Sequence, residues 1–208
     1  RIAEAWRTRR AELEARADEV IATLRAEAGG SRATGRLPGE GVFADAAAMA
    51  ARSYDAEWGG FSGAPKFPRT AMVRMLFRCS ERTGDGSARE MGLRTLDRII
   101  AGGIHDHLGG GFHRYSVDGF WHVPHFEKML YDQALLAIAY LEAYQATGKP
   151  EYAQTARETL AYVLRDLTSP DGGFYSAEDA DSEGVEGKFY LWSLDEVRKT
   201  LGEEESRL

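Results

Sequence analysis

The sequence has one cysteine, no long apolar run and no excess of basic residues, and each of these absences excludes a class of protein. Because Cys79 stands alone, the chain can form no internal disulfide and no paired-cysteine redox or zinc site. No stretch approaches the roughly 18 apolar residues of a membrane span. The formal charge of −7 argues against nucleic acid, which binds basic surfaces. We therefore expect neither a membrane protein nor a nucleic-acid-binding protein.

The start of the chain also lacks the charged segment, apolar core and cleavage site of a signal peptide, so we expect a cytoplasmic protein. With 43% hydrophobic residues the chain can bury a sizeable core. Cys79 lies in the apolar run MVRMLFRC and is expected to be a buried small side chain rather than a nucleophile.

Histidine is absent from most of the chain and concentrated in one stretch, residues 102–128. Connections this long inside a compact domain are usually functional or disordered. This one is too rich in aromatic residues to be disordered, so we interpret it as an ordered loop that carries the site. It contains all five histidines of the protein, His105, His107, His113, His122 and His125.

The flanking segments show the three- and four-residue apolar spacing of helices. It predicts helices over 2–28, 45–57, 70–82, 87–101, 129–147 and 150–168, and a short helix after 193. The capping-box patterns Ser87-x-x-Glu90 and Ser193-x-x-Glu196 are expected to begin two of them. Aromatic runs at 174–177 and 188–192 predict a short β-hairpin in the last long loop.

Long and very short connections alternate along the chain. Helices joined by short loops are antiparallel neighbours, so the long loops at 59–69, 102–128 and 169–193 are expected to gather on one face. Each long loop carries the tripeptide Gly-Gly-Phe, ending at Phe61, Phe112 and Phe174, and such recurrence marks an array of supersecondary units. We expect the phenylalanines to plug the end of the core. The fold class is thus all-α, with helical hairpins forming part of an (α/α)6 toroid.

Three segments follow from this pattern. Residues 1–29 are expected to be a linking outer helix, residues 30–41 a connector, and residues 42–208 the partial toroid domain. The sequence is in helical phase from its first residue, which suggests a piece of a longer protein.

The stretch His122-Val-Pro-His125-Phe-Glu127 places two imidazoles and a carboxylate close together, downstream of His105. Imidazole and carboxylate suit a metal, but the spacing matches no common zinc motif, and no metal or cofactor is expected. Acid–base chemistry by His125 is one alternative, because histidine titrates near neutrality. The other is that the histidines only order the loop through hydrogen bonds.

A run of five acidic residues, 178–186, lies in the third long loop. It resembles a calcium loop, but Tyr190 occupies the position of the bidentate glutamate. Asp179 and Asp181 are candidate catalytic carboxylates, whereas Glu183 and Glu186 are interpreted as a solvated hairpin tip. The remaining candidates are aromatic residues able to stack on sugar rings and cations able to bind a carbonyl or an anion: Trp58, Trp121, Tyr175, Lys66 and Arg114.

Three segments, WGGFSGAPKFPR, GGIHDHLGGGFHRYSVDGFWHVPHFEKMLYDQA and DGGFYSAEDADSEGVEGKFYLW, resemble thioredoxin-domain-containing proteins of the spermatogenesis-associated protein 20 type, also called the YyaL family. The resemblance covers most of residues 40–208. It implies a thioredoxin-like domain N-terminal to this segment in the longer protein. It also implies an (α/α)6 barrel similar to N-acylglucosamine 2-epimerases and six-hairpin glycosidases, of which this chain holds about half.

Two functions remain open at this stage. In the first, the domain is carbohydrate-active, of the epimerase/isomerase or glycosidase type. Its candidate catalytic residues are His125, Glu127, Asp179 and Asp181, and its candidate substrate-binding residues are Trp58, Lys66, His105, Arg114, Trp121, His122 and Tyr175. In the second, the barrel is a non-catalytic module that binds a sugar or a protein for the attached thioredoxin-like domain.

Overall fold

The computed structural model describes residues 2–29 and 39–206, which form two compact units that divide at Gly39. The first unit consists of α1 (Ile2–Thr8) and α2 (Arg10–Gly29). The expected single helix over 2–28 is therefore interrupted at Arg9. Most of the expected connector, residues 30–41, lies outside the described residues.

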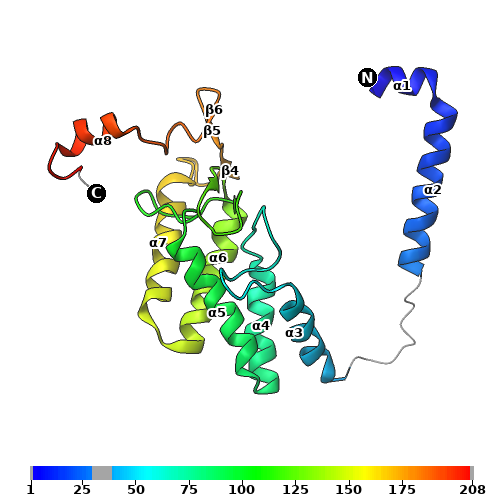
Figure 1. Cartoon of the computed structure of the whole chain (residues 1–208), viewed down its shortest axis with the longest axis horizontal. Coiled ribbons are helices and arrows are strands. Elements are labelled where there is room, and N and C mark those ends of the chain that lie inside the picture. Colours follow the sequence, from blue (N-terminus) through cyan, green and yellow to red (C-terminus); the bar gives the residue numbers. More distant parts are fainter. Residues whose placement is uncertain (1, 30–38, 207–208) are drawn as a thin grey trace. The chain divides into compact units, whose positions relative to one another are not determined.

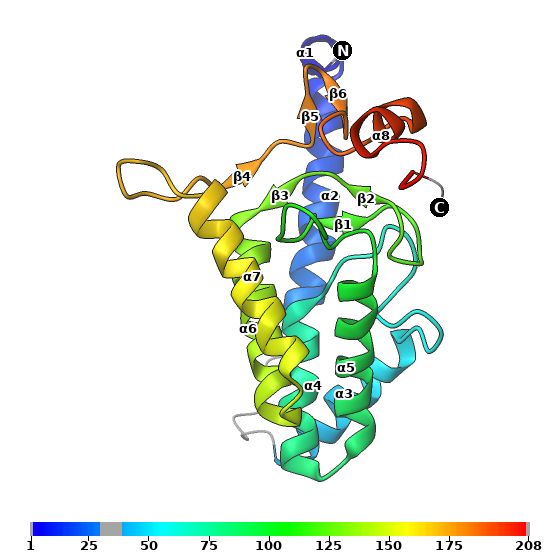
Figure 2. The same cartoon turned by 90° about the vertical axis from the view of Figure 1, so that its left-hand side faces the viewer.

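The second unit is built from helical hairpins (Figures 1 and 2). Helix α4 packs against α5, α6 packs against α7, and α4 and α6 also pack against each other. The tight turns after α4 and α6 need glycine, because Gly84 and Gly148 have φ angles of 74° and 72°. The helices are α3 (Gly41–Ser53), α4 (Thr70–Thr83), α5 (Gly86–Ala101), α6 (Leu130–Thr147), α7 (Pro150–Asp166) and α8 (Leu194–Leu201).

The core lies between the helices, and α4 shows how the sequence builds it. Its apolar residues recur at three- and four-residue steps, so that Val73, Leu76 and Phe77 face inward. Cys79 is fully buried with them, which confirms its expected burial, and burial raises the pKa of its thiol. None of the described helices combines the length and apolar character needed to cross a bilayer.

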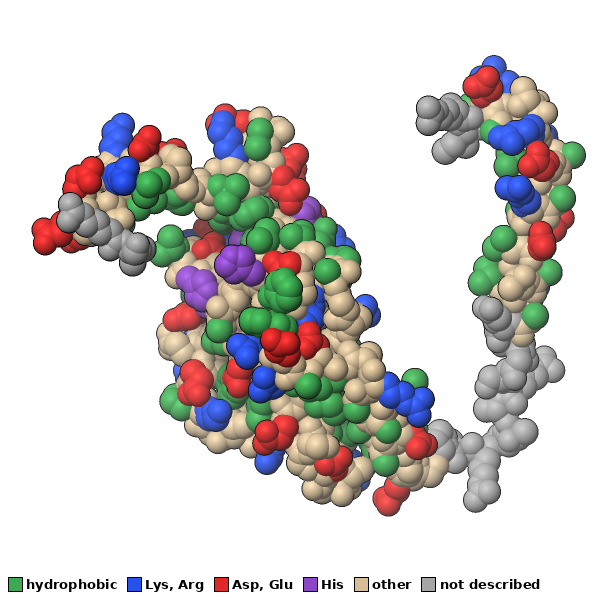
Figure 3. Space-filling model, in the orientation of Figure 1, with side chains coloured by type: hydrophobic (Ala, Val, Ile, Leu, Met, Phe, Trp, Pro, Cys, Tyr) green, Lys and Arg blue, Asp and Glu red, His purple; other side chains and the backbone are tan. Residues whose placement is uncertain are grey.

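Both short connections lie at one end of the hairpins, and the long loops gather at the other (Figure 2). The predicted single loop face is therefore present. Figure 3 shows histidine side chains at this end of the unit, beside acidic and apolar groups.

Short antiparallel strands tie the long loops together. Within the second loop, β1 (Tyr115–Ser116) pairs with β2 (Pro124–His125). The second loop is joined to the third by β3 (Lys128–Met129), which pairs with β4 (Ala177–Glu178). In the third loop, β5 (Asp181–Ser182) pairs with β6 (Val185–Glu186).

The predicted β-hairpin exists in the third loop, but its expected strands at 174–177 and 188–192 are wrong. The chain turns instead at Glu183-Gly184, where both residues have positive φ, the geometry of a two-residue hairpin turn. This leaves Ala177 free to pair with Met129 of the second loop.

Two helix starts also differ from prediction. The helix expected at 45–57 runs over 41–53, because Tyr54 and Asp55 belong to the first long loop. The N-cap of α5 is Asp85, whose carboxylate accepts from the Ser87 N–H at 2.9 Å, and not Ser87 itself. The capping box at Ser193 is confirmed.

Candidate functional site

The first Gly-Gly-Phe loop is a closed turn organised by Asp55. Its backbone N–H donates to the Gly60 carbonyl at 3.0 Å, and its carbonyl accepts from Gly59 at 2.8 Å. Oδ1 accepts from the backbone N–H groups two and three residues later. Oδ2 accepts from Lys66 Nζ at 2.6 Å. Burial opposes ionisation of Asp55, but these hydrogen bonds outweigh it and lower its pKa.

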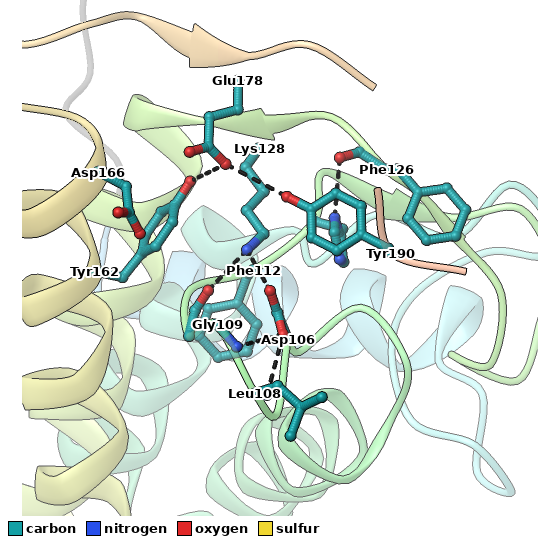
Figure 4. A network of polar contacts seen from close by, with 12 residues as sticks. Asp106, Leu108, Gly109, Phe112, Phe126, Lys128, Tyr162, Asp166, Glu178 and Tyr190 are labelled. Atoms are coloured by element: carbon teal, nitrogen blue, oxygen red, sulfur yellow. Dashed lines mark hydrogen bonds and ion pairs between the residues drawn. The ribbon is translucent and has the colours of Figure 1, made fainter. Parts of the chain in front are cut away.

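The second loop repeats this turn 51 residues later, around Asp106. Its Oδ1 accepts from Leu108 and Gly109, and its Oδ2 accepts from Lys128 Nζ at 2.7 Å (Figure 4). Lys128 also donates to the Gly110 carbonyl at 2.9 Å. Two loops with different sequences thus share one device, a buried lysine that closes an aspartate-centred turn.

The third loop lacks this device. Ser169 takes the place of the aspartate, and its N–H donates to the Gly173 carbonyl at 2.7 Å. Phe61 and Phe112 are buried in the core as expected, whereas Phe174 is 57% exposed. The expectation of a core plug is therefore wrong for Phe174.

Two expected substrate-binding residues, one from the first loop and one from the second, lie in the interior. Lys66 and Trp121 are both fully buried, with Nζ 5.4 Å from the centre of the indole ring. Trp121 donates from Nε1 to the Trp58 carbonyl at 2.9 Å. Trp58 itself is half-buried against Phe120 and the guanidinium of Arg98. The buried pair is therefore placed to hold the loop rather than to touch a ligand.

Two histidines of the second loop are held by backbone carbonyl groups, and burial lowers the pKa of both. Burial lowers the pKa of His105, and its Nδ1 lies 3.1 Å from the Ile100 carbonyl while its ring stacks on Phe112. Burial, with Lys128 nearby, lowers the pKa of His113 to about 4. Both histidines thus hold the loop through contacts with its backbone, which is one of the two alternatives that the sequence analysis gives for the histidines.

His125 has a different environment, because carboxylates lie near both of its ring nitrogens. Nδ1 is 2.7 Å from Oε1 of Glu186. Nε2 is 3.9 Å from Oε2 of Glu127, and the same oxygen accepts from Arg114 Nη1 at 2.8 Å. The structure therefore brings together three residues that the sequence singles out, His125, Glu127 and Arg114. All three side chains are partly exposed.

An aromatic stack borders this histidine. Tyr115 lies opposite His125 in the β1–β2 pair, and their rings stack at 4.8 Å. The ring of Phe67 is tilted by 34° against that of Tyr115, with 4.6 Å between the ring centres. The imidazole is thus oriented by the face of the Tyr115 ring and by the carboxylate of Glu186.

Glu186 is exposed on the hairpin, as interpreted from the sequence, but the sequence analysis missed its contact with His125. It lies opposite Asp181 in the β5–β6 pair and turns its carboxylate to His125. The signal was the two-residue turn at Glu183-Gly184, which sets this register. Asp181 is exposed next to Glu186, and Asp179 accepts from the Asp181 N–H at 3.1 Å.

The other expected contacts lie outside this cluster. His122 is exposed, and its backbone N–H donates to Asp118 at 3.2 Å. Tyr175 is 50% exposed on the third turn. Within the described residues, no group of three or more histidine, cysteine or acidic side chains is arranged to hold a metal ion.

Asp132, in the first turn of α6, is a second ionisable group near the cluster. Its Oδ2 is buried and has no hydrogen-bond partner among the described residues. Burial raises its pKa to about 6, a shift that Arg114 opposes and Glu127 reinforces. Asp132 lines a cavity of about 400 Å³ between the start of α4 and α6.

With this geometry established, the chain can be compared with known proteins. No protein-family model matches it. Human spermatogenesis-associated protein 20 is 52% identical over 160 residues, which cover 72% of this chain and 20% of the human protein. The mouse protein is 44% identical over 220 aligned positions, covering 98% of this chain and 27% of the relative.

The chain is a homologue of spermatogenesis-associated protein 20. It spans about a fifth to a quarter of the length of the relatives of that name. Among solved structures, cellobiose 2-epimerase from Bacillus thermoamylovorans matches with a TM-score of 0.57 and 14% identity, over 80% of this chain and 52% of the enzyme. The cellobiose 2-epimerase from Spirochaeta thermophila gives the same score at 21% identity, over 66% of this chain and 39% of that enzyme. These likenesses show the α/α-toroid fold for this chain.

Proposed function

We propose that this domain is carbohydrate-active and that His125 exchanges a proton with a sugar, as in an epimerase or isomerase. The observation that carries the proposal is the pairing of both His125 nitrogens with carboxylates, Glu186 at 2.7 Å and Glu127 at 3.9 Å. A histidine oriented in this way is suited to general acid–base catalysis near neutral pH. The fold shared with cellobiose 2-epimerases supports the choice of ligand class.

In this proposal the Nδ1–H of the neutral imidazole donates to Glu186, which leaves the Nε2 lone pair as the base. Nε2 takes a proton from the carbon next to a sugar carbonyl, and the electron pair moves to the carbonyl oxygen. Arg114 stabilises the enolate oxygen, and Glu127 stabilises the imidazolium. Return of the proton to the carbon completes the exchange.

This chemistry agrees with the geometry better than glycoside hydrolysis does. A glycosidase needs two carboxyl groups free to flank a glycosidic bond. Glu127 and Glu186 are instead engaged by Arg114 and His125. Asp179 and Asp181 remain in the proposal as partner carboxylates beside the cluster.

The alternative is a non-catalytic module that presents a sugar or a protein to a thioredoxin-like domain in the longer protein. The exposure of Phe174, Phe189 and Trp192 on the third loop favours it, because large exposed aromatic side chains are typical of contact surfaces. In either case we place the protein in the cytoplasm without a nucleic-acid or membrane partner.

The test follows carbon-bound hydrogen directly. The protein is incubated in D2O with cellobiose, mannose and N-acetylglucosamine, and proton NMR monitors exchange at the carbon next to the carbonyl. We expect exchange that is lost with His125→Asn and retained with His107→Asn, an exposed histidine outside the cluster. Binding without exchange in the wild type supports the module, and equal exchange in both variants excludes His125 as the base.

A further inference from the structure

The cavity beside Asp132 lies between α4 and α6, next to the His125 cluster. Its volume is about 400 Å³, within the range of small-ligand sites. Most of its lining is apolar, and its polar groups lie at the start of α4 and, as Asp132, in the first turn of α6. The lining consists of Phe67, Pro68, Arg69, Thr70, Ala71, Asp132 and Leu136.

We propose that this cavity binds a neutral, hydroxyl-bearing ring, with Asp132 as its central polar contact. The proposal deepens the proposed function, because it assigns a sugar-type ring to a subsite beside His125. It begins from the buried Oδ2 of Asp132, which has no partner among the described residues. A buried polar atom without a partner costs free energy, and a ligand hydroxyl beside the carboxyl would remove that cost.

The start of α4 adds hydrogen-bond donors on the same side. The N-cap residue Arg69 has a left-handed backbone and makes no capping hydrogen bond with its side chain. The first N–H groups of a helix have no acceptor within the helix, so those of Thr70 and Ala71 can donate to hydroxyl oxygens. The apolar wall of Phe67 and Leu136 suits the C–H face of a ring.

The charges around the cavity are of both signs, with Asp132 and Arg69 in its lining, and we therefore expect a neutral ligand rather than an ionic one. An anion would be repelled by the carboxyl group of Asp132 and by the nearby Glu127, which also raises the pKa of Asp132. An ammonium group would be repelled by the positive N-terminal end of α4 and by Arg114, a cation that lowers the pKa of Asp132. A neutral ring with hydroxyl groups avoids both conflicts.

Two sets of contacts link the cavity to His125. Phe67, in the cavity wall, contacts Tyr115 with a tilted ring, and Tyr115 stacks on His125. Arg114 is near enough to lower the pKa of Asp132, and it also forms an ion pair with Glu127 beside His125. A ring bound at Asp132 therefore lies on the same face as the proposed base.

The experiment maps binding by amide NMR on the isotope-labelled protein. The probes are mannose, N-acetylglucosamine and cellobiose, with cyclohexylamine and cyclohexanecarboxylate as charged ring controls. We expect at least one sugar to shift the amide signals of Thr70, Ala71 and Leu136, and neither charged ring to do so. Asp132→Leu should weaken that binding about tenfold or more, and Asp132→Asn should weaken it less.

Asp171→Leu is the matched control, because Asp171 is exposed on the third loop. Asp132→Leu removes a partly desolvated carboxyl, so it should fold, and thermal melting checks this. The subsite is excluded if no sugar shifts the three cavity amides, or if Asp132→Leu binds as tightly as the wild type. Sugar shifts confined to Tyr115 and His125 overturn the subsite and leave the proposed function intact. If a sugar binds in the cavity but exchanges no carbon-bound hydrogen, the result supports the subsite and contradicts the proposed catalysis.

Discussion

Lys128 is buried against Asp106, with 2.7 Å between Nζ and Oδ2 and 2% of the lysine side chain exposed. The same relationship joins Lys66 to Asp55 at 2.6 Å in the preceding loop. In both, the aspartate also binds two backbone N–H groups, so the ion pair fixes the path of a whole loop. The positions of Tyr115 and His125 depend on the first of these loops, because the backbone of Lys66 pairs with β1, and β1 pairs with the strand that carries His125.

Replacing Lys128 with methionine should destabilise the protein strongly. The substitution leaves the Asp106 carboxylate buried without its cation, and removing one partner of a buried pair costs about 3–5 kcal/mol. Lys188→Met is the matched control, because Lys188 is half exposed and its pairing with Glu183 is at the surface; such pairs contribute about 0–1 kcal/mol. Urea denaturation measures both, and equal losses would show that burial of Lys128 is unimportant.

Gly111→Ala should cost more stability than Gly148→Ala. Both glycines have similar positive φ angles, 74° and 72°, so both substitutions carry the left-handed backbone cost of about 1–2 kcal/mol. A Cβ at Gly111 would also lie 2.5 Å from Cδ1 of Tyr162, whereas none of the surrounding atoms lies within 4 Å at Gly148. Overpacking adds about 1–3 kcal/mol. Thermal unfolding of the two variants separates this steric cost from the backbone cost.

The wild type should lose stability as the pH falls below about 6.5, because His113 stays neutral in the fold. Its pKa is lowered to about 4 by burial and by Lys128. Between about pH 6.5 and pH 4, His113 therefore binds a proton in the unfolded chain but not in the folded chain. From pH 7 to pH 5 this linkage amounts to roughly 2 kcal/mol. His113→Asn removes it, so denaturant titrations at the two pH values should show a smaller decrease in the variant. An unchanged decrease would place the acid sensitivity elsewhere.

Asp132 should produce the opposite pH dependence. Its raised pKa of about 6 means that the folded state holds its proton more tightly than the unfolded state. The resulting stabilisation is fully present below about pH 4 and is lost as the pH rises through 6. Asp132→Asn should therefore become more stable than the wild type at pH 7 to 8. The difference is on the order of 1 kcal/mol after allowance for partial exposure. A constant difference between pH 4 and pH 8 would contradict the raised pKa.

The sequence predicts the helical hairpins and the shared loop face because both follow from local signals. Glycines such as Gly84 and Gly148 end helices, and the loop lengths place consecutive hairpins side by side. It fails where two candidates compete at one position. Asp85 and Ser87 are both good N-caps, and only the backbone angles of the folded chain select Asp85.

The candidate site is predicted less completely, because its members come from different loops. His125, Glu127 and Arg114 are near one another in sequence, and the structure brings their side chains together. Glu186 is 61 residues from His125, and its pairing depends on how the third loop turns. The burial of Lys66 could not be predicted either, because nothing in the neighbouring sequence distinguishes this interior lysine from a surface one.

The absence of a locking aspartate at Ser169 has a consequence for motion. The first two loops must break a buried ion pair before their backbone amides can exchange with solvent, whereas the third has only its own backbone and hydroxyl contacts there. Hydrogen exchange should therefore be slow at Trp58 and Gly109 and fast at Asp171. Glu186 belongs to that third loop, so the carboxylate that contacts His125 is carried by the loop that lacks a buried ion pair. We therefore expect local opening of the third loop to release the imidazole from Glu186 without unfolding of the helices.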